Sequence, residues 1–176
     1  MSRVMTPYVA LLRAINVGGT GKLEMVELRQ MCEGCGFTNV ATYIQSGNVV
    51  FQSKRSESSV LKLLEQTLAE RMGKPVGVLV RTADELGSVL AHNPFPEAPP
   101  NKLIVLFLDK PAPRGALDDV ETPGGEQLAA HGREIFIHYP QGQGKSQLKL
   151  PFQRVGTGRN FNTVSKLHAM LSALPI

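Results

Sequence analysis

The segment of residues 8–15 is apolar at every position except Arg13. Side chains of a strand point alternately to the two faces of its sheet. A strand that is apolar at both odd and even positions therefore belongs to a sheet with both faces covered. Residues 102–108 predict a second strand of the same kind. Two sheets of one chain packed together would cover these faces, and a homodimer would cover them equally well.

Residues 7–81 contain a regular succession of strand and helix patterns. Four side chains spaced at i, i+3, i+7 and i+10 from Met25 form the apolar stripe of an amphipathic helix. The sequence Ser-Gly-Asn at 46–48 predicts a hairpin turn between two strands. The elements expected in this half are strands at 8–15, 39–45, 49–52 and 76–81, and helices from 25 to about 35 and over 56–72. This β-α-β-β-α-β order is that of the ferredoxin-like unit.

The second half repeats this succession of strands and helices less regularly. Thr82 and Glu85 have the spacing of a capping box, which predicts a helix beginning after Thr82. Asn160 or Asn162 is expected to cap the closing helix. The other elements expected are an extended proline-rich connector at 93–100, strands at 102–108 and 154–158, a helix at 112–120, and a hairpin of 126–131 and 134–139 around Gly132-Arg133.

The predicted fold is therefore α+β, with two ferredoxin-like (alpha-beta plait) units that contain antiparallel sheets, followed by a C-terminal helix. We expect the first unit at residues 1–81, the capped helix and connector at 82–101, and the second unit with the terminal helix at 102–176. A length of 176 residues suits this division, and 42% apolar residues with 19% charged residues exclude a disordered chain.

Targeting and membrane signals are not evident in the sequence. No stretch approaches the roughly 18 unbroken apolar residues of a membrane helix. The opening residues MSRVMTPYVA lack the apolar core of a signal peptide. These observations predict a cytoplasmic protein that does not associate with membranes.

The net charge of +4 is distributed unevenly along the chain. Residues 1–134 carry 14 basic and all 15 acidic side chains, whereas residues 135–176 carry five basic side chains and no acidic one. A terminal region of one sign favours an anionic partner, although charge says little about fold.

Two motifs that suggest redox or metal chemistry have simpler interpretations. Cys32 and Cys35 form a C-x-x-C pair, but both lie near a helix C-terminus, where the dipole opposes a thiolate, and on the apolar stripe. We therefore expect core cysteines. The four histidines lack H-x-x-H or H-E-x-x-H spacing, so no metal site and no cofactor are predicted.

Glycine-rich segments after two strands are the strongest candidates for a ligand site. Residues 16–22 join a strand to the start of a helix, where backbone N–H groups favour an anion. Residues 142–146 follow a strand of the second half. Asn16 and Tyr139 stand where the P-loop motif requires its first glycine, so neither segment is a P-loop. A tight turn is the alternative for each.

Arginine and lysine side chains near these segments complete the predicted site. Arg13 carries the most weight, because an arginine in an apolar strand needs a partner or a strand-end position beside a ligand. The alternative is that Arg13 simply ends the strand, or is satisfied by carbonyls or an acid. The predicted ligand-binding residues are Arg13, Asn16, Gly18, Gly19, Lys22, Gln45, Ser46 and Asn48, joined by Lys145, Ser146, Arg159 and Asn160 if the two halves face each other.

RNA recognition by base stacking is disfavoured, although RNA-recognition modules share the predicted topology. Alignment on Gly47 places Asn48 and Val50 where the third-strand motif of those modules has its stacking aromatic residues. The chain also has no tryptophan and only 6% aromatic residues. Binding to a nucleic-acid backbone through charge stays open.

Three blocks of the sequence resemble a known family. They are LLRAINVGG at 11–19, TYIQSGNVVF at 42–51 and TGRNFNTVSKL at 157–167, and the family is the bacterial domain-of-unknown-function family 1697. The resemblance implies tandem ferredoxin-like units and no established activity. Ala14 stands where the family usually has glycine, Phe161 where it often has tryptophan, and the two cysteines where it tends to have aliphatic residues.

The leading hypothesis is a binding protein for an anionic ligand, either a nucleotide-like small molecule or a nucleic-acid backbone. An enzyme acting on a phosphorylated or acyl substrate is the first alternative, but the motif blocks contain no carboxylate or histidine to serve as general base. A protein-interaction or assembly module is the second, and it would expose an apolar sheet face.

Overall fold

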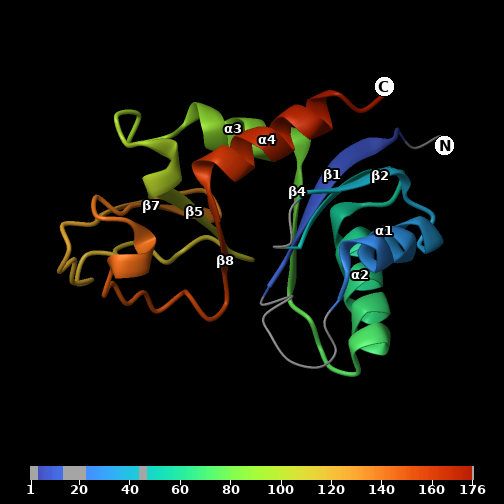
Figure 1. Cartoon of the computed structure of the whole chain (residues 1–176), viewed down its shortest axis with the longest axis horizontal. Coiled ribbons are helices and arrows are strands. Elements are labelled where there is room, and N and C mark those ends of the chain that lie inside the picture. Colours follow the sequence, from blue (N-terminus) through green and yellow to red (C-terminus); the bar gives the residue numbers. More distant parts are fainter. Residues whose placement is uncertain (1–3, 14–22, 44–46, 176) are drawn as a thin grey trace. The chain divides into compact units, whose positions relative to one another are not determined.

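The computed structural model describes residues 4–13, 23–43 and 47–175 of the chain. It has a mixed α+β fold with two four-stranded antiparallel sheets and a C-terminal helix (Figure 1). The chain divides into two compact units, residues 1–86 with 167–176 and residues 87–166. In the described residues, no helix combines the length and the hydropathy that a membrane span requires.

The first unit contains one sheet and two long helices. Its strands are arranged in the order β2-β3-β1-β4, and each neighbouring pair is antiparallel. The elements are β1 (Thr6–Leu12), α1 (Met25–Gly34), β2 (Thr38–Tyr43), β3 (Asn48–Ser53), α2 (Glu57–Met72) and β4 (Val78–Thr82). Both helices and all four strands expected in this half are present.

Both faces of the first sheet are buried along β1, as the sequence of this strand predicts. Tyr8, Ala10 and Leu12 point into a core that also contains apolar residues of α1 and α2. Val9 and Leu11 alternate with them and are also fully buried. Since alternate residues of a strand face opposite sides, the burial of both sets means that neither sheet face is exposed along β1.

Phe51 of β3 lies at the centre of the first core. Its ring stacks on that of Phe37 with 4.3 Å between centroids, and the Tyr8 ring is tilted against it at 6.0 Å. Val60, Leu64 and Leu68 recur along α2 at the spacing of one helix face and contribute to the same core. The apolar stripe of α2 thus packs α2 against the sheet.

Capping groups are present at both ends of α2. The Ser56 hydroxyl accepts a hydrogen bond from the Ser59 N–H. At the other end, Gly73 adopts a left-handed conformation with φ 71° and donates its N–H to the Ala69 carbonyl. Glycine is favoured there because a side chain strains this backbone region.

The second sheet has the strand order β6-β7-β5-β8 and is also antiparallel throughout. Its two-residue hairpin loop at Gly132-Arg133 is present, and Gly132 has φ 58°. The elements are α3 (Ala83–Ala91), the 3-10 helix η1 (Pro100–Lys102), β5 (Leu103–Phe107), β6 (Gln127–His131), β7 (Glu134–His138), the 3-10 helix η2 (Gln143–Lys145), β8 (Thr157–Asn160) and α4 (Phe161–Ser172).

Side-chain caps fix the starts of α3 and α4. Thr82 N–H donates to the Glu85 carboxylate at 2.9 Å and Glu85 N–H donates to the Thr82 hydroxyl at 3.2 Å, which confirms the predicted capping box. Asn160 accepts from the Thr163 N–H at 2.8 Å. Of the two caps expected for the closing helix, Asn160 is therefore the one used.

One expectation for the second half is wrong, and one strand is shifted along the chain. The expected helix at 112–120 is a series of turns, in which Ala116 N–H donates to the Pro113 carbonyl and Asp118 N–H to the Gly115 carbonyl. Gly115 has φ 79°, which is incompatible with a right-handed helix. The strand expected at 154–158 instead occupies Thr157–Asn160, because a turn ending at Val155 precedes it.

Candidate functional site

One end of the first sheet contains Arg13 and Asn48, the two described residues of the predicted anion site that belong to the first unit. At this end β1 and β2 finish while β3 and β4 begin, because the strand register pairs Leu12 with Val78 and Tyr43 with Asn48. Arg13 follows β1 directly, Asn48 is the first residue of β3, and Gly77 directly precedes β4. The ends of three strands therefore place Arg13, Asn48 and Gly77 at the same end of the sheet.

Arg13 is half-buried and lies against a glycine. Its N–H donates to the Gly77 carbonyl at 2.9 Å. A Cβ added to Gly77 would lie 2.9 Å from Cδ and 3.1 Å from Nη1 of Arg13. Real Cβ atoms do not approach that closely, so the absence of a side chain at Gly77 allows the Arg13 side chain to occupy this position. β1 ends at Leu12, so Arg13 directly follows the strand that was expected to continue to residue 15.

Asn48 holds the hairpin of β2 and β3. Its side chain is fully buried, and its amide Nδ2 donates to the Tyr43 carbonyl at 3.0 Å. Gly47 precedes it with φ 77° and accepts a hydrogen bond from the Leu12 N–H. The Asn48 side chain therefore has a structural role at the same end of the sheet where a ligand was predicted.

Six predicted ligand-binding residues lie outside the described residues. They belong to two segments that are attached to this end of the sheet through described neighbours. Residues 14–22 follow Arg13, and residues 44–46 connect Tyr43 to Gly47. The six residues are Asn16, Gly18, Gly19, Lys22, Gln45 and Ser46.

The predicted residues of the second unit have separate environments. Lys145 ends η2 and is exposed, and the Ser146 hydroxyl accepts from the Leu148 N–H at 3.0 Å. Arg159 is buried in β8, where Nη1 donates to the Thr157 hydroxyl at 2.6 Å and the Gly158 carbonyl at 2.9 Å. Burial lowers the pKa of Arg159 to about 10.

Arg81 is a buried arginine that the sequence analysis missed. It is only 1% exposed in β4, and its Nη1 donates to the Val80 carbonyl at 3.0 Å. It is paired with Val9 of β1, as Arg159 is paired with Val105 of β5. Each arginine also directly precedes the residue that caps the following helix. A lone cation within the apolar strand VLVRT is the signal that could have found it.

The comparisons with known proteins are consistent with this architecture. The model of the family described as "Protein of unknown function (DUF1697)" matches residues 5–136. The chain belongs to the DUF1697 family. A solved structure similar to this DUF1697 chain is that of the conserved bacterial protein SP0830 from Streptococcus pneumoniae. Its TM-score is 0.80 at 26% sequence identity, and the alignment covers 96% of this chain and 99% of SP0830. No curated protein matches the sequence.

The cysteines of the DUF1697 chain are core residues, as expected. Cys32 is fully buried in the first core, and Cys35 is partly buried against that core with its sulfur 3.6 Å from the Thr67 hydroxyl. Neither forms a disulfide. Burial raises the pKa of the Cys32 thiol to about 12, which removes its thiolate at neutral pH. Among the described residues, no cluster of three or more histidine, cysteine or acidic side chains could hold a metal.

We expect iodoacetamide to distinguish the two thiols. Cys35 should be alkylated in the native protein, whereas Cys32 should react only after unfolding, because its sulfur is fully buried and protonated. Peptide mapping by mass spectrometry measures both sites, and Cys35→Ser should remove the native-state labelling. Equal labelling of the two cysteines in folded protein would contradict their placement.

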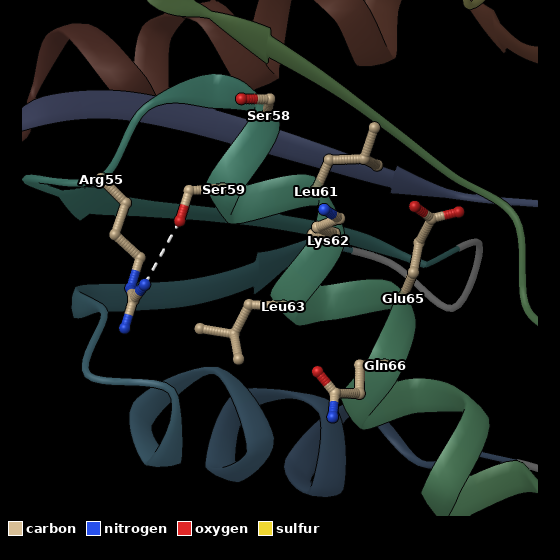
Figure 2. A pocket seen from close by; sticks show the side chains of 8 residues that line it. All are labelled: Arg55, Ser58, Ser59, Leu61, Lys62, Leu63, Glu65 and Gln66. Atoms are coloured by element: carbon tan, nitrogen blue, oxygen red, sulfur yellow. Dashed lines mark hydrogen bonds between the residues drawn. The ribbon is translucent and has the colours of Figure 1, made fainter.

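A hollow of about 650 Å³ is present on the first unit but does not contain the predicted site residues. Figure 2 shows its lining side chains arising from α2 and the residue Arg55 that precedes this helix. Arg55 Nη1 donates to the Ser59 hydroxyl at 3.2 Å across it. Because one helix supplies nearly the whole lining, the hollow is an open depression on the surface of α2.

Proposed function

We propose that this DUF1697 protein binds a phosphate- or carboxylate-bearing, nucleotide-like ligand at the end of the first sheet, with Arg13 as the principal cation. The observation that carries the proposal is the position of Arg13 against Gly77, half-buried at a strand end. Partial burial strengthens a charge-assisted hydrogen bond, and the planar guanidinium can bind both oxygens of a phosphate or carboxylate.

The glycine-rich segment attached to Arg13 is proposed to supply the other donors. Backbone N–H groups of Gly18 and Gly19, with the side chains of Asn16 and Lys22, would surround the anion. Gln45 and Ser46 would add polar contacts from the neighbouring hairpin, which the buried Asn48 side chain holds in place. A role for Lys145, Ser146, Arg159 and Asn160 stays a prediction.

We also propose that both sheets belong to ferredoxin-like units repeated in tandem. The support is the order β1-α1-β2-β3-α2-β4 with strand order β2-β3-β1-β4, and the matching order β6-β7-β5-β8 in the second sheet. The second unit would have lost its helices between strands. A cytoplasmic location is proposed because both cysteines are free.

A thermal-shift series tests the ligand proposal. The probes are inorganic phosphate, a nucleoside monophosphate, a sugar phosphate and a short oligonucleotide. A ligand at about 100 times its Kd stabilises by about 2.7 kcal/mol, which raises Tm by roughly 5–10 °C in a protein of this size. We expect at least one of these anions to produce such a shift.

Three variants test whether the ligand-induced shift in Tm arises at Arg13. Arg13→Ala should abolish the ligand-induced shift, and Gly77→Ala should weaken it because the new Cβ displaces the Arg13 side chain. Arg154→Ala removes an exposed arginine and should leave the shift unchanged. The proposal is rejected if no anion stabilises the protein, or if Arg13→Ala is stabilised as much as the parent protein.

A further inference from the structure

β6 is an open edge of the second sheet. It pairs with β7 on one side only, and Gln127, Ala130 and His131 are exposed. Of the other edge strands, β4 is largely buried, β8 alternates between buried and more exposed residues, and β2 is partly exposed. An edge strand presents a row of backbone donors and acceptors that another strand can pair with.

The register of the hairpin identifies the outward-facing groups. A two-residue loop is closed by a hydrogen-bonded pair, here His131 with Glu134, and such pairs alternate along the strands. The N–H and C=O groups of Leu128 and Ala130 therefore point away from β7. In agreement, Leu108 N–H donates to the Arg133 carbonyl and Tyr139 N–H donates to the Lys102 carbonyl. These two bonds flank β5 and β7 and fit the same alternation of hydrogen-bonding directions. Within the described residues, no hydrogen bond engages the backbone of Leu128 or Ala130.

The side chains of β6 are fixed on both faces of the sheet. Leu128 packs against the second core. On the other face, Gln127 Oε1 lies 2.8 Å from His138 Nδ1, and the His131 ring stacks on that of His92 with 4.4 Å between centroids. The strand is thus held in place, and Gln127, Ala130 and His131 along it are exposed.

β6 also lacks the devices that protect sheet edges. Its sequence QLAAH contains no lysine, acidic residue or proline, and its pairing with β7 has no bulge. β2, the exposed edge of the first sheet, differs in this respect. Its register shifts between Thr38 and Ala41, where Asn39 adopts φ 53°. Such a bulge disrupts pairing with another strand.

We propose that β6 binds a second copy of this chain by antiparallel strand addition about a two-fold axis at Ala129. The sequence of the strand is self-complementary in this register: Leu128 lies opposite Ala130 of the second copy, and Gln127 lies opposite its His131. Leu128 and Ala130 form two hydrogen-bonded pairs across the axis. No like charges oppose each other in this register.

Because only five residues of each copy pair, the contact is smaller than a standard interface of about 1,600 Å². We therefore expect a weak, reversible dimer with a Kd in the micromolar range or above. The proposal does not depend on ligand binding at the first sheet.

Cysteine trapping tests the register in the full chain. Ala129 of the two copies would be directly opposed at a non-hydrogen-bonded position, where Cα atoms lie about 4.5 Å apart, within the range that a disulfide bridges. Under mild oxidation, Ala129→Cys should form a disulfide-linked dimer at least tenfold faster than the neighbouring Ala130→Cys, whose opposite residue is Leu128. Equal rates in the two variants would overturn the proposal.

Sedimentation over a concentration series tests the association itself. The parent protein should gain mass at concentrations approaching 1 mM, and Ala130→Pro should remain monomeric because proline removes an outward N–H without breaking a bond to β7. An unchanged Tm and circular dichroism spectrum in Ala130→Pro would show that the fold is kept. A parent protein that stays monomeric throughout, or equal association of Ala130→Pro, would contradict strand addition.

Discussion

Replacing Phe51 with alanine is expected to lower the free energy of unfolding by about 3–5 kcal/mol. The Phe51 ring is fully buried, stacks on Phe37 at 4.3 Å and contacts Tyr8. Removing it deletes the ring contacts with Phe37 and Tyr8 and leaves a cavity that the close-packed core cannot fully fill. Since most domains are stable by only about 5–15 kcal/mol, this is the largest loss we expect from a single side chain.

Urea denaturation followed by circular dichroism measures this loss. Phe51→Leu is the matched variant, because it keeps an apolar side chain of moderate volume and should cost much less. If Phe51→Ala is too unstable to purify, the leucine variant still gives a measurable change. A cost below about 1 kcal/mol for Phe51→Ala would contradict the position of this ring at the centre of the core.

Gly156→Ala is expected to destabilise the second unit by about 1–3 kcal/mol. A Cβ at this position would lie 2.8 Å from the Phe107 carbonyl oxygen and 2.9 Å from a Leu108 methyl carbon. The carbonyl belongs to the last residue of β5, so relief of the clash requires movement of one of the two central strands of the sheet. Gly156→Val, which adds a larger side chain, should lower the free energy of unfolding more than Gly156→Ala does.

Gly144→Ala is the control for this prediction. A Cβ on Gly144 meets no atom within 4 Å, so this change should leave the free energy of unfolding within about 0.5 kcal/mol of the parent value. Chemical denaturation of both variants gives the comparison. Equal stability of the two variants would show that β5 and the chain at Gly156 are not closely packed.

The first half of the fold could be predicted because local signals and tertiary packing agree there. Ser56 and Gly73 bound α2 in the sequence and in the structure. The apolar residues of β1 on both parities predicted two covered sheet faces, and both are buried. Where capping residues, apolar periodicity and turn residues all indicate the same element, local sequence is enough to predict that element.

The second half was harder because its connections contain few regular elements. The apolar residues within 112–120 resemble a helical pattern, but Pro113 and Gly115 divide the segment into turns. Leu117 and Val120 still pack against the second core. The apolar residues of this segment therefore predicted correctly that it is partly buried. They could not predict a helix, because a buried turn also needs apolar side chains.

The candidate site was only partly accessible to sequence reasoning. Arg13 could be recognised as an arginine at the end of an apolar strand, and the same logic applied to β4 would have found Arg81. The contact between Arg13 and Gly77 joins residues far apart in the chain, so no local pattern contains it. Asn160 was ambiguous because one side chain can cap a helix or bind an anion, and the structure shows the cap.

The most direct test of the proposed site is an NMR titration of the full chain with inorganic phosphate and then with AMP. We predict that, among the described residues, the largest changes in amide chemical shift occur at Arg13, Asn48 and Gly77, the residues at the end of the first sheet, and that Arg13→Ala removes them. Largest changes in the second sheet, or no changes at tens of millimolar probe, would contradict an anion site at Arg13.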